Sequence, residues 1–186
     1  MEGNIVIDLD ETLLHTYTDR AKFEAFQPKY GEEKFDLGRF YGVLRPNVKS
    51  FIGWCSGNFK EIGVWSAGQQ EYVDEIVDLL FKGRKPTFVW CWDDCDAYTN
   101  EDGRAVYHKP LEFVFDLIPG FTPKNTLFID DSAHSDICNA GNMITITPFN
   151  PEDTPQVPDN SMAELKRVIK KYKKVKDVRL VEKKII

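Results

Sequence analysis

Apolar residues in this chain gather in short runs that alternate with amphipathic stretches, and this pattern predicts an α/β fold. Short runs rich in β-branched and aromatic residues predict strands, whereas apolar residues at helical spacing predict helices. The expected strands are residues 5–9, 61–65, 87–92, 126–129 and 143–146, with a hairpin over 35–44. The expected helices are residues 47–55, 69–81, 110–117, 135–140 and 162–172. This alternation favours a parallel sheet with helices on both faces.

Local signals refine several of these boundaries. The hairpin is expected to turn near Leu37 and Gly38. Asn47 is a candidate N-cap for the helix that follows, and Pro110 suits the first turn of another helix. The acidic stretch 93–103 is expected to be a loop.

Length and composition favour one globular domain. The chain has 186 residues, of which 42% are hydrophobic and 29% charged, so it can bury a substantial core. No apolar run approaches the roughly 18–20 residues that a membrane helix needs, and no signal peptide is visible. Cys91 and Cys95 could begin a zinc site, but no second pair follows, so reduced thiols in a cytoplasmic or nuclear protein are favoured.

Charge is unevenly distributed along the chain. From Ser161 to Ile186 ten Lys or Arg stand against three Asp or Glu, a local charge of +7 within a total of −6, which leaves −13 elsewhere. We therefore divide the chain into a domain over 1–172 and a basic C-terminal tail over 173–186. A solvated helix face with a frayed tail explains this charge, and contact with an acidic protein, nucleic acid or membrane surface is the alternative.

The apolar run near the N-terminus ends in two aspartates one residue apart, Asp8 and Asp10. Because side chains alternate along a strand, both carboxylates would lie on one side of the chain where the strand ends. Ligands of open parallel α/β sheets bind outside the carboxyl ends of the strands, and two carboxylates there suit a magnesium ion and a phosphate ester. Taken alone, such a pair could equally be a solvated turn.

Other expected strands also end in polar residues. Ser66 and Ala67 precede a helix, where a hydroxyl and backbone donors can hold a phosphate, although Ser66 could be a plain cap. Lys109 is a candidate phosphate ligand and charge neutraliser. Asp130 and Asp131 are adjacent carboxylates whose repulsion a cation would relieve.

Taken in order, the segments DLDETLL, WSAG, HKP and FIDDS resemble the four motifs of phosphatases of the haloacid dehalogenase superfamily. The segment DLDETLLHT, the hairpin before Arg45-Pro46 and the ending IDDS are most similar to one branch, the phosphatases of the RNA polymerase II C-terminal domain and their small relatives. The resemblance covers roughly residues 4–172. It implies a Rossmann-like parallel sheet flanked by helices, with small hairpin insertions and no large cap domain.

The resemblance also implies a chemistry and its residues. Asp8 matches the nucleophile that becomes an aspartyl phosphate, Asp10 the general acid and base, and Thr12 a residue that orients the first carboxylate. The cofactor implied is Mg²⁺. The phosphate-binding residues implied are Thr12, Ser66, Ala67 and Lys109, and the metal ligands are Asp8, Asp10 (through its backbone carbonyl), Asp130 and Asp131. Asp131 departs from the branch, which often has Asn there, and adds a negative charge.

Substrate choice is expected to depend on residues 82–108, which match the family's insertion beside the active site. Five acidic residues there disfavour strongly acidic peptides: Asp93, Asp94, Asp96, Glu101 and Asp102. Four aromatic residues could form an apolar docking surface or simply pack as strand core: Phe88, Trp90, Trp92 and Tyr98.

Three functions follow from these observations. A magnesium-dependent protein serine/threonine phosphatase is favoured, because short insertions leave the site open to a phosphorylated peptide, and a monomer is expected. A phosphatase for metabolites, nucleotides or nucleic-acid ends is the second hypothesis, to which the basic tail gives some support. A non-catalytic binding module is the third, because a mitochondrial translocase subunit carries a related domain, but the intact acidic residues argue against it.

Overall fold

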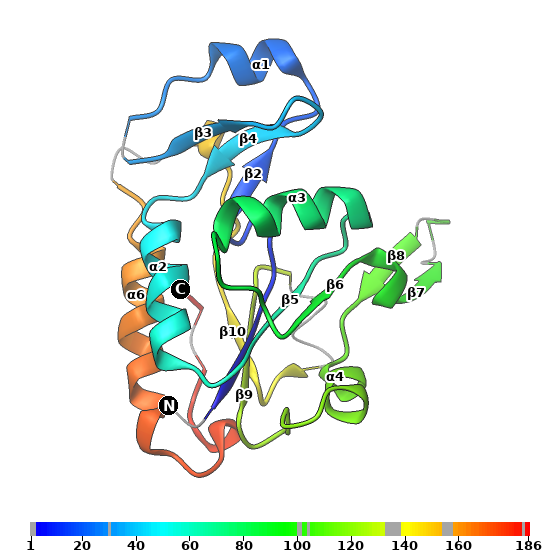
Figure 1. Ribbon diagram of the computed structural model, residues 1–186, viewed down its shortest axis with the longest axis vertical. Coiled ribbons are helices and arrows are strands. Elements are labelled where there is room, and N and C mark those ends of the chain that lie inside the picture. The colour runs from blue at the N-terminus through cyan, green and yellow to red at the C-terminus, as the bar shows by residue number, and fades with distance from the viewer. Residues whose placement is uncertain are drawn as a thin grey trace.

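A five-stranded parallel sheet forms the centre of the computed structural model, which describes residues 3–29, 31–99, 102–103, 105–132, 139–153, 158–183 and 185–186 (Figure 1). Its strand order is β10-β9-β1-β5-β6, and all neighbours in it are parallel. In chain order these strands are β1 (Asn4–Ile7), β5 (Ile62–Trp65), β6 (Phe88–Trp90), β9 (Thr126–Asp130) and β10 (Met143–Thr145). Their runs are almost entirely apolar, as expected of strands buried on both faces.

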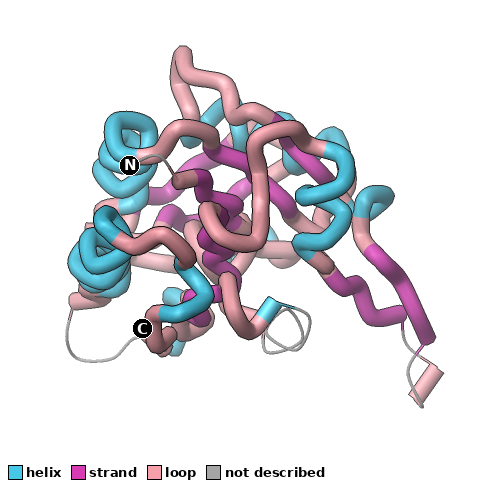
Figure 2. The backbone as a smooth tube through the Cα atoms, turned by 90° about the horizontal axis from the view of Figure 1, so that it is seen from below, coloured by secondary structure: helices cyan, strands magenta, loops and turns pink. Residues whose placement is uncertain are grey.

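Helices cover both faces of this sheet (Figure 2). Because side chains alternate along a strand, Ile5 and Ile7 pack with residues of α2, α3 and α6, whereas Val6 packs on the opposite face with residues of α4. These four helices span Val48–Asn58, Gln70–Leu80, Ser161–Ile169 and Leu111–Leu117 respectively. The expected α/β architecture with a central parallel sheet is confirmed.

Two small insertions accompany the sheet (Figure 1). The first follows β1 and forms an antiparallel sheet of order β2-β4-β3, covered by a short helix α1. Its elements are β2 (Leu14–Thr16), α1 (Arg20–Ala25), β3 (Glu33–Asp36) and β4 (Tyr41–Leu44). The second is an antiparallel hairpin of β7 (Asp96–Thr99) and β8 (Ala105–His108), which projects to one side of the molecule.

The structure tests several of the local predictions. The hairpin turns at Gly38, whose φ of +84° suits glycine. Asn47 is the N-cap residue of α2, as predicted, but its backbone is left-handed (φ 65°) and its side chain makes no capping hydrogen bond. The stretch predicted as an acidic loop contains a 3₁₀ turn, Trp92–Asp94, and then β7. The helix predicted at 135–140 lies mostly outside the described residues.

The basic C-terminal segment packs against the domain instead of forming a solvated tail. Beyond α6 the chain continues in a 3₁₀ turn, Lys170–Lys174, and the side chain of Val178 is buried in the core. The amide of Ile186 donates to the carbonyl of Thr145 (3.0 Å), and its carbonyl accepts from the amide of Thr147 (2.5 Å). These bonds cover the exposed edge of β10, which would otherwise offer unpaired backbone groups. Within the described part of the chain, no helix has the length and apolar character needed to cross a membrane.

Candidate active site

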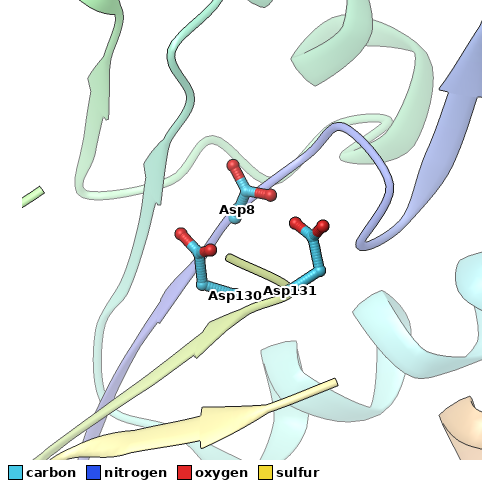
Figure 3. Close-up of side chains that lie close together, drawn as sticks. All are labelled: Asp8, Asp130 and Asp131. Carbon is cyan, nitrogen blue, oxygen red and sulfur yellow. The ribbon is translucent and has the colours of Figure 1, made fainter. Parts of the chain in front are cut away.

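The order of strands in the sheet brings distant polar residues to one edge. β5 and β9 both pair with β1, so the chain segments that leave their carboxyl ends lie next to each other. Asp8 continues β1 by donating from its amide to the carbonyl of Ile129 (3.0 Å), and its side chain faces those of Asp130 and Asp131 (Figure 3). One carboxylate oxygen from each of these three aspartates lies within 4.8 Å of the other two.

Lys109 is the cation of this cluster, held at the start of the segment that leads from β8 into α4. Its Nζ donates to Asp8 Oδ1 (2.5 Å) and to Asp130 Oδ2 (2.9 Å), and all three side chains are at least 93% buried. Asn139 fixes the backbone here, donating to the Lys109 carbonyl (2.8 Å) and accepting from the amide of Leu111 (2.9 Å). Burial would lower the pKa of Lys109, but the Asp8 and Asp130 carboxylates outweigh it and raise that pKa.

The three carboxylates exceed the charge that one lysine can balance. Burial raises the pKa of Asp8 well above its usual value; Lys109 opposes this rise and Asp130 adds to it. Burial, followed by the neighbouring Asp130 carboxylate, raises the pKa of Asp131 to about 6. An all-oxygen donor set with excess negative charge fits a hard divalent cation such as Mg²⁺.

Two hydroxyl groups donate to the Asp10 carboxylate, and a third contacts one of these two. Ser66 Oγ donates to Asp10 Oδ2 (3.1 Å), and Tyr72 Oη donates to Asp10 Oδ1. Thr16 Oγ1 lies 2.8 Å from Tyr72 Oη. The Ser66 hydroxyl also accepts from the amide of Gly68 (2.9 Å). Burial raises the pKa of Asp10, and the hydrogen bonds from Tyr72 and Ser66 oppose this rise.

A tight turn after Asp10 places the next motif residues. Glu11 adopts a left-handed conformation (φ 55°), and its amide donates to the carbonyl of Leu14 (2.8 Å). The fully buried Thr12 donates from Oγ1 to Asp131 Oδ1 (3.3 Å), which ties this turn to the end of β9. A non-glycine residue in the left-handed region is uncommon and persists only where the surroundings hold it, as they do here.

Arg45 holds the backbone of the same turn through a hydrogen bond to Thr12. Its buried guanidinium donates to the carbonyl of Thr12 (3.0 Å) and to that of Thr147 (2.9 Å), which joins the first motif to the segment after β10. It also donates to Asp159 Oδ2 (2.8 Å) and to Ser161 Oγ (2.9 Å) at the start of α6. The Arg45 side chain is only 2% exposed, so this arginine belongs to the internal support of the site.

The structure brings the predicted site residues together in one region, although one of them, Ala67, can contribute only through its backbone. Side-chain hydrogen bonds or ion pairs join them in three groups: Asp8, Asp130 and Lys109; Asp10 and Ser66; and Thr12 and Asp131. Ala67 is exposed at the turn before α3 and can offer only backbone groups. Of the four aromatic residues predicted to lie in an insertion, Phe88 and Trp90 instead belong to β6 of the central sheet, where Phe88 is buried and Trp90 partly buried, whereas Trp92 and Tyr98 are exposed.

Sequence reasoning missed two residues of this site. Tyr72 lies within the helix predicted over 69–81, and Arg45 directly follows the predicted hairpin, but neither was predicted to belong to the site. A signal for Tyr72 did exist, because this residue lies in the first turn of α3, the helix that follows Ser66. No local pattern marks Arg45, since all four of its partners are distant in sequence.

Comparisons with known proteins agree with this geometry. The model of the NLI interacting factor-like phosphatase family matches residues 4–179. A search of curated proteins finds no match.

Several solved structures share the fold. Fcp1, described as an essential RNA polymerase II CTD phosphatase, has a TM-score of 0.56 and 16% identity over 90% of this chain and 48% of its own. A fission yeast Fcp1 variant bound to beryllium fluoride has a TM-score of 0.57 and 17% identity over 90% of this chain and 50% of its own. This chain therefore spans about half the length of those two structures. An uncharacterized protein from Listeria monocytogenes serotype 4b has a TM-score of 0.59 and 14% identity over 93% of this chain and 99% of its own.

Proposed function

Because this chain belongs to the NLI interacting factor-like phosphatase family, we propose that it is a magnesium-dependent protein serine/threonine phosphatase that works through a phosphorylated Asp8. The observation that carries this proposal is the different surroundings of its two motif aspartates. Asp8 is paired with a lysine beside two further carboxylates, whereas Asp10 is held by hydroxyl groups. Two carboxyl groups with different partners suit two different roles in one reaction.

In the first step, a carboxylate oxygen of Asp8 attacks the phosphorus atom of the ester. The bond from phosphorus to the ester oxygen breaks, and that oxygen takes the proton of Asp10 as it leaves as an alcohol. In the second step, Asp10 takes a proton from a water molecule, whose oxygen attacks the phosphorus of the acyl phosphate. Inorganic phosphate leaves, and Asp8 is regenerated as a carboxylate, so covalent catalysis divides one difficult displacement into two.

The remaining residues lower the electrostatic barrier to this attack. A phosphate dianion repels the Asp8 carboxylate, and Lys109 supplies a fixed positive charge beside it. The Ser66 hydroxyl and the backbone amide of the exposed Ala67, just before α3, would serve as donors to the phosphate oxygens. Asp8, Asp130 and Asp131 would hold Mg²⁺, which supplies further charge neutralisation at the phosphate when bound.

The preference for a protein substrate rests on the small insertions. The two described insertions are a three-stranded sheet with one short helix and a two-stranded hairpin, and neither is a domain that could close over a small metabolite. Exposed acidic residues, including Asp93 and Asp96, accompany the exposed Trp92 and Tyr98 on the hairpin side. This surface favours a neutral or basic peptide around the phosphorylated residue.

The decisive experiment measures hydrolysis of p-nitrophenyl phosphate with Mg²⁺ and with chelator, in wild type and Asp8→Asn. We expect metal-dependent turnover in wild type and none in Asp8→Asn, with both proteins equally folded by circular dichroism. Asp116→Asn, which removes an exposed carboxylate from α4, is the matched control and should retain wild-type turnover. Steady turnover by Asp8→Asn would refute the nucleophile assignment.

The substrate class needs a second comparison. Phosphoserine and phosphothreonine peptides with neutral or basic flanks should be hydrolysed with a higher kcat/KM than nucleoside monophosphates. The reverse order would replace the protein phosphatase with a phosphatase for small molecules. No magnesium-dependent hydrolysis of any ester would favour a non-catalytic binding module.

A further inference from the structure

A chain of hydroxyl groups runs from the first insertion to Asp10. Thr16 lies at the end of β2, and its Oγ1 is 2.8 Å from Tyr72 Oη on α3. Tyr72 Oη in turn contacts Asp10 Oδ1. The other oxygen of Asp10, Oδ2, accepts from Ser66. The two oxygens of this carboxyl group therefore have separate partners on opposite sides.

The number of protons on these groups determines which hydroxyl donates and which accepts at each hydrogen bond. An ionised carboxylate only accepts hydrogen bonds, so Tyr72 must give its single proton to Asp10 Oδ1. The remaining contact of Tyr72 Oη is then an acceptor contact, which Thr16 fills with its own hydroxyl proton. Tyr72 is thus oriented as a donor, and Oδ1 stays an acceptor. When Asp10 takes up a proton, that proton is directed to Oδ2, on the side of Ser66.

Ser66 cannot be the residue that holds Asp10 throughout the reaction. Its hydroxyl lies at the start of α3, where a phosphate group is expected, and a single hydroxyl proton cannot serve Asp10 and a phosphate oxygen together. The Tyr72 hydroxyl contacts Asp10 and Thr16 instead of lying at the expected phosphate position. It would remain bonded to Oδ1 while the phosphate occupies the site.

The ring of Tyr72 is itself firmly seated. The residue is 8% exposed, and the ring of Phe40 packs against it edge to face at 5.1 Å. Gly68 leaves room for the ring, because a Cβ at that position would lie 2.6 Å from Tyr72 Cδ1. The hydroxyl is therefore placed by contacts from the first insertion and from the loop that carries Ser66.

From this geometry we propose that Tyr72, supported by Thr16, is a positioning residue that holds Asp10 with Oδ2 free to give its proton to the leaving oxygen. The proposal rests on the proposed phosphatase reaction and adds a residue to it. It predicts that the effect of losing Tyr72 depends on the leaving group of the substrate. A proton donor accelerates departure of a basic alkoxide far more than departure of a stable phenolate.

The test compares Tyr72→Phe with wild type on two esters, a phosphoserine peptide and 2,4-dinitrophenyl phosphate, at saturating Mg²⁺. We expect kcat/KM for the peptide to fall by about 10-fold or more, and that for the aryl ester to change by less than about 3-fold, since misplacing a general acid forfeits part of its usual contribution. The ratio of the two values within one variant is independent of how much of the protein is folded. A purely structural role for Tyr72 would lower both values equally.

A double-mutant cycle with Thr16→Val tests whether Thr16 acts through Tyr72. Thr16→Val should lower the peptide value several-fold in wild type and have no further effect in Tyr72→Phe, because Thr16 acts only through Tyr72. Tyr41→Phe is the matched control: it removes a phenol hydroxyl from the insertion that carries Thr16. This hydroxyl donates to the carbonyl of Thr18 (3.4 Å), so its loss should leave the ratio unchanged.

The outcomes separate this proposal from the reaction on which it rests. Wild-type protein that hydrolyses neither ester would overturn the proposed function. Active wild-type protein whose ratio is unchanged in Tyr72→Phe would overturn the positioning role of Tyr72 alone.

Discussion

Lys109 donates a hydrogen bond of 2.5 Å to the carboxylate of Asp8, 101 positions earlier in the chain. The same Nζ donates to Asp130, whose side chain is fully buried. A single buried cation therefore stands between the end of β1 and the end of β9. Its removal would leave carboxylates facing one another without water to separate them.

Lys109→Met should abolish most activity and destabilise the metal-free protein. Removing one partner of a buried ion pair typically costs about 3–5 kcal/mol, because the other charge stays buried and unpaired. We expect kcat/KM to fall by at least about 100-fold through loss of a fixed charge beside the phosphate. Urea denaturation and hydrolysis assays check both effects. Lys82→Met, at an exposed position in the turn that follows α3, serves as the control and should change neither quantity.

Magnesium should raise the thermal stability of this protein, and Asp131 should mediate part of the effect. A ligand that binds only the folded state at 100 times its Kd stabilises it by about 2.7 kcal/mol. In Asp131→Asn the magnesium-induced rise in Tm should shrink, while the metal-free Tm should rise, because one repelling carboxylate is gone. Scanning calorimetry with and without Mg²⁺ tests these opposite signs. An undiminished magnesium effect in Asp131→Asn would remove this residue from the metal site.

Hydrolysis of an alkyl phosphate should be fastest on the acid side of neutrality. Burial raises the pKa of Asp10, so its proton persists to a higher pH than in an ordinary aspartate, and kcat/KM should fall as pH rises through that pKa. Asp8 attacks only when ionised; burial raises its pKa, whereas Lys109 and bound Mg²⁺ favour the carboxylate, so its ionisation gives the opposite limb on the low-pH side. The profile should be measured on a phosphopeptide with Mg²⁺ saturating at every pH. A rate that keeps increasing with pH above neutrality would contradict the role of Asp10 as the acid.

Arg45→Met should be among the most destabilising substitutions at a residue outside the reaction itself. It removes four hydrogen bonds and leaves the half-buried Asp159 without its cation, and we expect a loss of about 3–5 kcal/mol in the free energy of unfolding. Arg39→Met is the matched control, because the Arg39–Glu71 pair is 69% exposed on both sides and should contribute about 0–1 kcal/mol. Equal losses in the two variants, measured by denaturation, would contradict a structural role for Arg45.

Much of the fold and site followed from local pattern. A strand buried on both faces requires a short continuous apolar run, so the strand ending in Asp8 and the strand ending in Asp130 were both visible in the sequence. Parallel strands share the edge at which their carboxyl ends lie, so the gathering of these aspartates and the loop that carries Ser66 at one edge of the sheet was also predictable. The strand β7 was not predictable, because its residues are exposed and do not alternate between apolar and polar. They form a strand through their pairing with β8.

The sequence by itself determined the positions of the carboxylates, because strand periodicity and the order of motifs are properties of neighbouring residues. Only the tertiary structure decided which groups hold those carboxylates. The Tyr72 hydroxyl reaches Asp10 across 62 positions, and the Arg45 guanidinium joins segments up to 116 positions away. Such contacts depend on how helices and insertions pack against the sheet. That packing sums many small dispersion and burial terms over the whole chain, and no local run of residues encodes it.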